Sequence, residues 1–396
     1  MEHEVHVEKR GAEAVLNLEP SSSLSVSYHP LFGPHPDIFL LELDHKLLPD
    51  ILHQRVVLRG QTDEDAVLCT QSKTYAIKFV GTSNSVFLIP PSDQSGFSDD
   101  AVDCDKKDQN QLPPVASVIK VVPGTMELSE VAPKLDKLKF LLFKNPYTSE
   151  EDIDMEGFEQ VQTGLYKWDD LVDLVQASDD ELRSGLQALS ALEIDGYWRV
   201  VDQKYMDMML RVLLHNSVLN DWSLDALHQD KVLDVLESDG FPRKLAEHCL
   251  CVYGHKVNKG VVTNCVWKLD EQKVCVHFAR EILRGGKRKM ESFIDEWNRK
   301  VPDSMQPSFN MLEGEVLTER FGAEIWMRAF SVSSLPLSPA ERFSILFKER
   351  QKWEWKDLQP YIRDLSVPGL SSEGLLLKYT RKTQPTVDAE PVFSAR

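Results

Sequence analysis

The N-terminal part of the chain is built from short apolar runs that are separated by turn-forming residues. The runs include DIFLLEL, RVVLRG, DAVLCT, KTYAIKFV and SVFLIP, and breakers such as Gly60 lie between them. Short runs rich in β-branched and aromatic residues are typical of strands. Tyr75, Ile77 and Phe79 alternate with small or polar residues, so one face of this strand is expected to be buried. The pattern predicts a small β barrel or sandwich within residues 1–125.

Beyond the strand-rich part, the apolar spacing becomes that of amphipathic helices. Trp168, Leu171 and Val175 recur three and four residues apart, which places them on one face of a helix. Ser178 can cap the helix that follows. A strand-like run begins at Tyr197. Helix, short turn, helix and strand is the order of a winged helix-turn-helix.

The same order of elements returns along the rest of the chain at spacings of about 60 to 70 residues, a size typical of small modules. We therefore predict the α+β class, with a β-barrel-like domain followed by tandem winged helices. The expected parts are a subunit-assembly domain at 1–125, winged helices at 126–203, 204–270 and 271–382, and a flexible tail at 383–396. The pattern leaves open whether the last three helices form a further unit. Residues 91–114 are expected to be a mobile loop, and residues 149–164 an acidic insertion.

Charge and composition restrict the functional classes. The 396 residues include 45 Lys and Arg against 63 Asp and Glu, giving a net charge of −18. This balance argues against a protein that holds nucleic acid through its overall charge, although local basic patches can still do so. Six cysteines without disulfide-scaffold spacing, and an N-terminus without an apolar signal core, favour reduced thiols in the cytosol or nucleus. The apolar runs are too short to cross a bilayer, so no membrane partner is expected.

Motifs for nucleotide binding and hydrolysis are missing from the sequence. It contains no G-x-x-x-x-G-K-[ST], G-x-G-x-x-G, G-x-S-x-G or H-E-x-x-H. Arg284-Gly285-Gly286-Lys287 lacks the length of a phosphate-binding loop, and His3-Glu4-Val5-His6 is one residue too short for the metalloprotease motif. We therefore expect no enzymatic activity and no cofactor. A scaffold that binds partner subunits and a DNA-binding adaptor are both favoured over an enzyme.

A cluster of histidines and cysteines raises the alternative of a zinc site. Its members are His248, Cys249, Cys251, His255, Cys265, Cys275 and His277. Structural zinc usually takes C-x₂₋₄-C pairs, whereas Cys249 and Cys251 would lie on different faces of a helix. Free cysteine is also a common core residue. The pattern therefore favours buried thiols, and no metal is expected.

Two groups of basic residues are the candidate DNA contacts. The first lies between two predicted helices, the second follows the last helix, and together they comprise Arg284, Lys287, Arg288, Lys289, Lys378, Arg381 and Lys382. Winged helices contact phosphates with such turns and wings. The alternative is a solvated charged surface, because exposed Lys and Arg need no functional explanation.

The candidate protein-docking residues are of two kinds. Asp179, Asp180 and Glu181 begin the third helix of the first module, where they would repel phosphates, so this helix, with Arg183, is predicted to dock protein. Two short apolar strands are candidate sheet edges for a partner strand. Their residues are Val86, Phe87, Leu88, Ile89, Val118, Ile119 and Val121. The alternative is that they are ordinary interior strands.

Long segments of the chain are similar to a known family. They are VVLRGQTDEDAVLCTQSKTYAIKFVGTSN, PKLDKLKFLLFKNPY, ASDDELRSGLQALSALEIDGYWRV, LAEHCLCVYG and RQKWEWKDLQPYIRDL. In this order they resemble the defective in sister chromatid cohesion protein 1 family, a subunit of an alternative replication factor C clamp loader. The loop at 91–114, the acidic insertion and both termini do not match clearly, and no function is transferred to them.

The resemblance implies specific partners and a nuclear location. It implies that the N-terminal strands join the large and small cohesion-specific subunits of the loader, the chromosome transmission fidelity proteins, in a shared multi-barrel module. It also implies that tandem winged helices contact the catalytic subunit of DNA polymerase epsilon and DNA, and that the complex acts on PCNA while other subunits hydrolyse ATP. The residues alone also allow a tandem winged-helix DNA-binding or transcription adaptor protein.

Overall fold

The computed structural model describes residues 24–89, 115–148, 164–257, 265–384, 386 and 389–396. The predicted loop at 91–114, and all but Gly164 of the predicted acidic insertion, lie outside this set. The chain divides into two compact units. The first unit comprises residues 1–55 and 75–129, and the second comprises residues 56–74 and 130–396. The α and β elements are mixed along the chain, as the sequence predicts.

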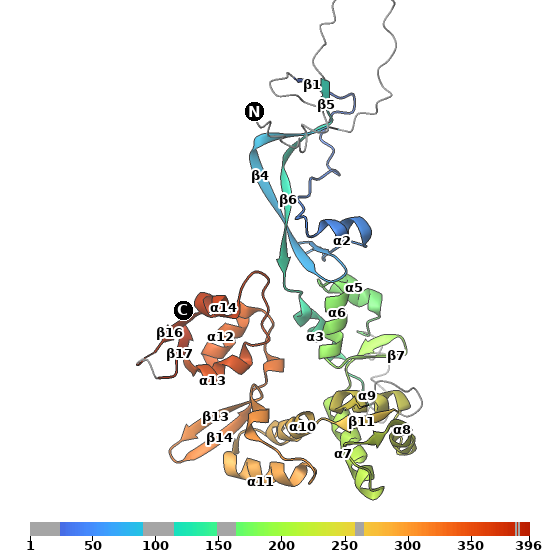
Figure 1. Cartoon of the computed structure of the whole chain (residues 1–396), viewed down its shortest axis with the longest axis vertical. Coiled ribbons are helices and arrows are strands. Elements are labelled where there is room, and N and C mark those ends of the chain that lie inside the picture. Colours follow the sequence, from blue (N-terminus) through green and yellow to red (C-terminus); the bar gives the residue numbers. More distant parts are fainter. Residues whose placement is uncertain (1–23, 90–114, 149–163, 258–264, 385, 387–388) are drawn as a thin grey trace, which may run out of the picture. The chain divides into compact units, whose positions relative to one another are not determined.

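The first unit consists mainly of strands. Its elements are β1 (Ser25–Tyr28), α2 (Leu48–His53), β4 (Thr74–Leu88), β5 (Val115–Val118) and β6 (Lys120–Val131). Strand β1 pairs with β5 in parallel, and the long strands β4 and β6 are neighbours in another sheet, as Figure 1 shows. The strand order is linear, and the described strands do not close into a barrel, so the barrel prediction was wrong. The described strands of this unit belong to two sheets, and the two outer strands of the larger sheet do not pair with each other.

Module A is the first helical module of the second unit. It contains α3 (Leu135–Lys144), α5 (Trp168–Leu174), α6 (Asp179–Ala188), β7 (Leu192–Ile194) and β8 (Tyr197–Arg199). Ser178 caps α6 as predicted, because its hydroxyl accepts from the Glu181 amide and Glu181 binds the Ser178 amide in return. Asp195 and Gly196 take positive φ values of 52° and 83° and join β7 to β8 in a tight hairpin. The short strands β2 (Val57–Arg59) and β3 (Val67–Cys69) also belong to the second unit.

Module B and module C follow with the same order of elements. Module B contains α7 (Gln203–Leu219), β9 (Leu227–His228), α8 (Gln229–Ser238), α9 (Arg243–Tyr253), β10 (Gly254–Lys256) and β11 (Val266–Leu269). Module C contains α10 (Glu271–Arg284), β12 (Arg288–Lys289), α11 (Met290–Lys300), the 3₁₀ turn η3 (Phe309–Leu312), β13 (Val316–Phe321) and β14 (Glu324–Ala329). In each sheet the last strand lies in the centre, in the orders β10-β11-β9 and β12-β14-β13.

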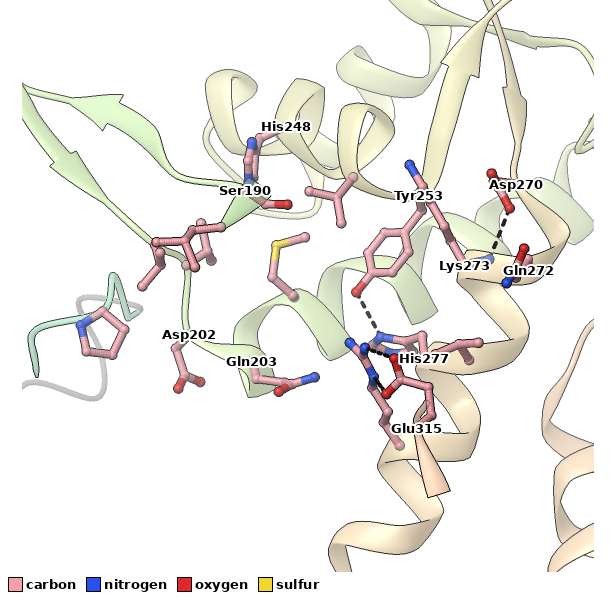
Figure 2. Close-up of a pocket in the computed structure, with 18 of the residues that line it drawn as sticks. Ser190, Asp202, Gln203, His248, Tyr253, Asp270, Gln272, Lys273, His277 and Glu315 are labelled. Atoms are coloured by element: carbon pink, nitrogen blue, oxygen red, sulfur yellow. Dashed lines mark hydrogen bonds and ion pairs between the residues drawn. The ribbon is translucent and has the colours of Figure 1, made fainter. Parts of the chain in front are cut away.

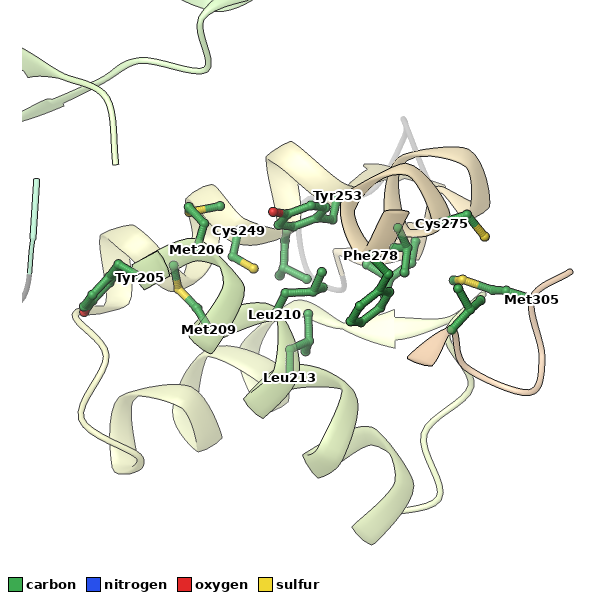
Figure 3. Close-up of a cluster of buried hydrophobic side chains, with 14 of the residues drawn as sticks. Tyr205, Met206, Met209, Leu210, Leu213, Cys249, Tyr253, Cys275, Phe278 and Met305 are labelled. Carbon is green, nitrogen blue, oxygen red and sulfur yellow. The ribbon is translucent and has the colours of Figure 1, made fainter. Parts of the chain in front are cut away.

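Modules B and C share one hydrophobic core. It runs from Leu192 to Met327 and includes Met209, Leu213 and Phe278, as Figure 3 shows for its central part. Leu213 and Met209 come from α7, and Phe278 comes from α10 of the next module. Continuous burial across the junction couples the two modules, because separating them would expose these apolar side chains to water.

Module D contains the last helices and strands that the structure describes. It contains α12 (Pro339–Glu349), β15 (Lys352–Glu354), α13 (Trp355–Leu358), the 3₁₀ turn η5 (Gln359–Tyr361), α14 (Ser372–Tyr379), β16 (Thr380–Thr383) and β17 (Val392–Ala395). Phe343, Trp353, Leu375 and Phe393 pack in a hydrophobic cluster that is separate from the main core of modules B and C but also includes Leu317 of β13 in module C. The predicted flexible tail at 383–396 was therefore wrong for β17, which is the central strand of the order β15-β17-β16. Its short Val-Phe run is too brief to be separated from a tail by periodicity alone.

Candidate functional site

Arg284, the first predicted DNA contact, is held by a buried carboxylate. Its Nη2 atom lies 2.5 Å from Oδ2 of Asp207 on α7, and only 10% of the Asp207 side chain is exposed. Removing one partner of such a pair leaves the other charge without compensation, which is strongly destabilising. Arg284 therefore joins α10 to α7, across the junction between modules B and C.

The same carboxylate belongs to a buried polar cluster. His277 Nε2 lies 3.3 Å from Asp207 Oδ1, and His277 Nδ1 is hydrogen-bonded to the Tyr253 hydroxyl at 2.8 Å. Burial lowers the pKa of His277, although the Asp207 carboxylate opposes the shift. Burial also raises the pKa of Tyr253. The directions of these shifts favour the neutral imidazole and the protonated phenol.

Tyr253 and His277 line a cavity of about 790 Å³. Figure 2 shows them together with His248, Lys273 and Glu315 around this space. The charged groups here bind one another: Glu315 accepts two hydrogen bonds from Arg280, at 2.8 and 2.6 Å. The cavity therefore lies at a junction of helices within the second unit, and several of its charged side chains are paired with one another.

The remaining cations of the first basic cluster are exposed and lie along the sheet of module C. Lys287 Nζ lies 2.5 Å from Glu319, and Lys289 Nζ lies 2.5 Å from Glu324. The hydrogen bond from Lys287 lowers the pKa of Glu319. Arg288 is 3.9 Å from a carboxylate of α11. Exposed pairs of this kind typically contribute about 0 to 1 kcal/mol, so these cations can exchange carboxylates for phosphates at little cost.

The second basic cluster lies in module D. Lys378 lies in the last turn of α14, and Arg381 and Lys382 lie on β16. All three side chains are exposed, and β16 is an outer strand of its sheet. Lys378 Nζ lies 5.3 Å from the centroid of the Tyr379 ring. The two predicted clusters thus belong to different modules.

The acidic start of α6 is engaged within the chain. The Arg59 guanidinium binds the Asp179 carboxylate, Gln71 donates to Asp180 Oδ1 at 3.0 Å, and Thr74 donates to Glu181 Oε2 at 2.6 Å. The residues from β2 to Thr74 therefore bind the three acids that the sequence predicts as docking residues, and of these acids Asp180 remains exposed. Arg183, by contrast, is exposed, and its guanidinium carbon lies 4.7 Å from the centroid of the Trp168 ring.

The predicted edge strands differ in exposure. In β4, Phe87 is 48% exposed, whereas Val86 and Leu88 are half-buried, as is Ile89 just after the strand. Val118 on β5 is buried and Val121 on β6 is 42% exposed. Ile119 lies between these two strands, and its amide donates to the Leu88 carbonyl at 2.9 Å. Strand β6 ends its sheet, so Val121 lies on an edge. The use of these edges by a partner remains a prediction.

Sequence reasoning missed the extent of apolar exposure in the first unit. Its large exposed apolar side chains are Val26, Tyr28, Leu31, Phe32, Phe39, Leu48, Leu52, Phe79, Phe87 and Val121. None of the three hydrophobic clusters found in the described residues includes a residue of this unit. Such exposure is typical of an interaction surface. Periodicity could not reveal it, because an apolar strand reads the same whether its own chain or a partner covers it.

The cysteines of the zinc alternative lie in different environments. Cys249 and Cys275 are buried, and burial raises the pKa of the Cys249 thiol to about 12 and that of Cys275 to about 11. Across the described ranges, no three His, Cys, Asp or Glu side chains converge in a way that could hold a metal ion. In the same ranges, no helix is both long and apolar enough to cross a membrane.

Comparison with known proteins identifies the family. The family model for "Sister chromatid cohesion protein Dcc1" matches residues 38–362. The human sister chromatid cohesion protein DCC1 is 33% identical over 354 residues, covering 88% of this chain and 86% of the human protein. The mouse protein of the same name is 34% identical, covering 88% of this chain and 84% of its own length, and the Saccharomyces cerevisiae protein is 21% identical over 91% and 97%.

These matches define a class of proteins named for sister chromatid cohesion. The chain belongs to the sister chromatid cohesion protein Dcc1 family. Neither the family description nor the names of these relatives designate an enzyme. Membership confirms the resemblance found in the sequence and implies a role in sister chromatid cohesion, which takes place on chromosomes.

Proposed function

We propose that this chain is a non-catalytic subunit of an alternative replication factor C clamp loader that acts on PCNA in the nucleus. In this role the first unit assembles with the large and small cohesion-specific subunits of the loader. The second unit links the loader to the catalytic subunit of DNA polymerase epsilon and to DNA. Membership of the cohesion family supports the biological setting.

One observation carries the assembly role: the first unit exposes large apolar side chains and lacks a hydrophobic cluster of its own in the described residues. Tyr28 is 75% exposed and Phe39 is 66% exposed. The four residues of β1 are all exposed, and β6 is an edge strand of its sheet whose outer side pairs with residues 40–42 at Met126. Partner strands that pair with these edges would bury the apolar faces and satisfy the free backbone groups.

The four modules of the second unit are proposed to be winged helices. The sheet orders of modules B, C and D support this assignment. In each module the last strand of the sequence is the central strand of the sheet. Its two neighbours are the strand after the first helix and the strand after the last helical element. Module A adds a tight hairpin after its third helix. Asp195 lies at the turn of that hairpin, and the start of α6 is acidic as well, so module A is proposed to contact protein rather than phosphates.

Purification of the intact complex tests the assembly role. Tyr28→Asp combined with Phe39→Asp, in the full-length chain, is expected to abolish capture of the clamp-loader large subunit, because charges would be buried in the interface. Leu377→Asp is the matched control, since Leu377 is 72% exposed in module D. Unchanged capture by the double variant contradicts the proposal. A chain that purifies alone and binds one specific duplex favours the transcription-adaptor alternative.

A further inference from the structure

Strand β16 of module D has an edge whose backbone groups are unpaired. Among the strands that the structure describes, only β17 pairs with it. The Arg396 amide donates to the Tyr379 carbonyl at 3.3 Å, at the start of this pairing. Bonded and non-bonded residue pairs alternate along antiparallel strands, so Arg381 and Thr383 bond to β17. Lys382, which lies between them, therefore turns its N–H and C=O groups outward.

The same edge carries cations on both faces of the sheet. Lys382 lies opposite Phe393, which is 5% exposed and packs in the core of module D. Arg381 lies opposite Ser394, on the other face of the sheet, because neighbouring side chains alternate. Both cations are exposed, as is Lys378 just before the strand. In the part of the chain that the structure describes, none of the three forms an ion pair.

The other outer strand of this sheet is less basic. Strand β15 has three residues and includes Glu354, whose carboxylate binds Lys356 at 2.7 Å. The four residues of β16 include two cations and no acid. Positive charge is therefore concentrated at β16, in a chain of net charge −18. Such an edge favours an anionic ligand, because opposite charge speeds encounter and excludes partners of like charge.

The geometry of the edge favours a peptide among anionic ligands. An added strand can accept from the Lys382 N–H and donate to its C=O, as in other cases of strand addition. Phosphate oxygens can only accept. An added strand also lies in the plane of the sheet, where its side chains meet Arg381 on one face and Lys382 on the other. Charged residues on an edge deter pairing with ordinary strands, and the same charges admit an acidic one.

We propose that β16 binds an acidic, extended segment of a partner protein as an added strand. Two neighbouring acidic residues of the segment point to opposite faces and meet Arg381 and Lys382. This inference goes beyond the proposed function, since neither the assembly of the loader nor its contact with DNA requires it. It assigns the second basic cluster to a protein ligand and leaves the first cluster as the candidate DNA contact.

Fluorescence anisotropy with the full-length chain and a labelled Val-Thr-Glu-Glu-Thr-Val peptide tests the proposal. Arg381→Glu combined with Lys382→Glu is expected to weaken binding at least about tenfold, because two attractive contacts become repulsive. Lys204→Glu combined with Lys244→Glu is the matched control, since both lysines are exposed in module B and the change in net charge is equal. The control is expected to bind within about twofold of the parent protein, because distant exposed charges are screened.

Modified peptides test strand addition on the unmodified chain. A peptide that is N-methylated at its four central residues cannot donate from either edge, and it should bind about tenfold more weakly. A peptide that is N-methylated only at alternate residues keeps one donating edge and should bind almost as well as the parent peptide. Both modified peptides retain the two carboxylates, so a difference between them reports backbone pairing rather than charge.

Four outcomes would overturn the proposal. The first is equal binding of the Glu peptide and a peptide with Lys in place of both Glu residues. The second is equal binding by the Arg381 and Lys382 double variant and the module B control. The third is full binding of the peptide that is methylated at all four central residues. The fourth is a chain that does not bind the Glu peptide but binds duplex DNA through Arg381 and Lys382, which would make the second cluster a DNA contact.

Discussion

Arg59 and Asp179, which are 120 residues apart in the sequence, form an ion pair at the start of α6. Only 6% of the Arg59 side chain is exposed, and its guanidinium also binds the Ala177 carbonyl. Residues 56–74 are joined at both ends to segments of the first unit, although they belong to the second. The ion pair therefore binds residues 56–74 to module A, although these residues lie within the strand-rich part of the sequence.

Arg59→Ala is expected to destabilise module A by about 3–5 kcal/mol, because the substitution leaves a carboxylate and a carbonyl without their partner. Chemical denaturation combined with hydrogen exchange of α6 measures this effect. Arg183→Ala, which removes an exposed arginine of the same helix, should change stability by less than about 0.5 kcal/mol. Equal stability of the two variants contradicts the account of the Arg59 contact.

Arg284 and Lys287 are neighbours in the basic cluster, yet their substitutions should have different effects. Arg284→Ala should lower stability by about 3–5 kcal/mol, because Asp207 is left buried without its cation. Lys287→Ala should leave stability within about 1 kcal/mol of the parent protein. Thermal unfolding distinguishes the two, and a stable Arg284→Ala variant would show that Asp207 does not depend on this contact.

Acid should destabilise the second unit through its buried histidines. Burial lowers the pKa of both His277 and His248 below the ordinary value of 6.5. In the unfolded chain these imidazoles take up protons near pH 6.5, whereas in the folded chain they do so only at lower pH. The unfolded state thus binds more protons in this window, and stability falls as the pH drops below about 6.5, by at most about 1.4 kcal/mol per pH unit for each histidine.

Denaturant titrations at several pH values measure this dependence. His277→Gln should lower the free energy of unfolding. It should also reduce the dependence of that free energy on pH below 6.5, because one buried imidazole is removed. His255→Gln is the control, since His255 is exposed on β10. An unchanged slope in the His277 variant contradicts the assignment of a neutral buried imidazole.

Substitution of Phe393 tests how much β17 contributes to the stability of module D. It is 5% exposed and belongs to the hydrophobic cluster of that module. Phe393→Ala is expected to cost about 3–5 kcal/mol, through lost burial and the cavity left behind. Limited proteolysis should then cleave within module D before the other modules. If the variant resists proteolysis as well as the parent protein does, β17 contributes little to the stability of module D.

Sequence periodicity predicted helices in the second unit because these helices have amphipathic faces. Ser178 and Glu181 gave the start of α6 directly, since a capping box is a local pattern. The barrel failed as a prediction because alternation within a strand does not tell which strands pair or whether they close. The strand β17 was missed because its core position depends on pairing with two other strands.

The candidate sites were less predictable, because their chemistry depends on contacts between distant residues. Nothing near Asp179 in the sequence indicates that Arg59 covers it. Arg284 resembles its basic neighbours, and only the fold shows that it faces Asp207. The lysines above the rings of Phe321 and Trp326 come from the segment before α11, which periodicity does not place beside those strands.

Hydrogen exchange of the native complex, compared with the isolated full-length chain, tests the central claim most directly. If the first unit is completed by partner subunits, β1, β4 and β6 should exchange markedly more slowly in the complex, because their edges and apolar faces become buried. Modules B and C, which already share a core, should change little outside their contacts with partners. Unchanged exchange throughout the first unit would contradict the assembly role.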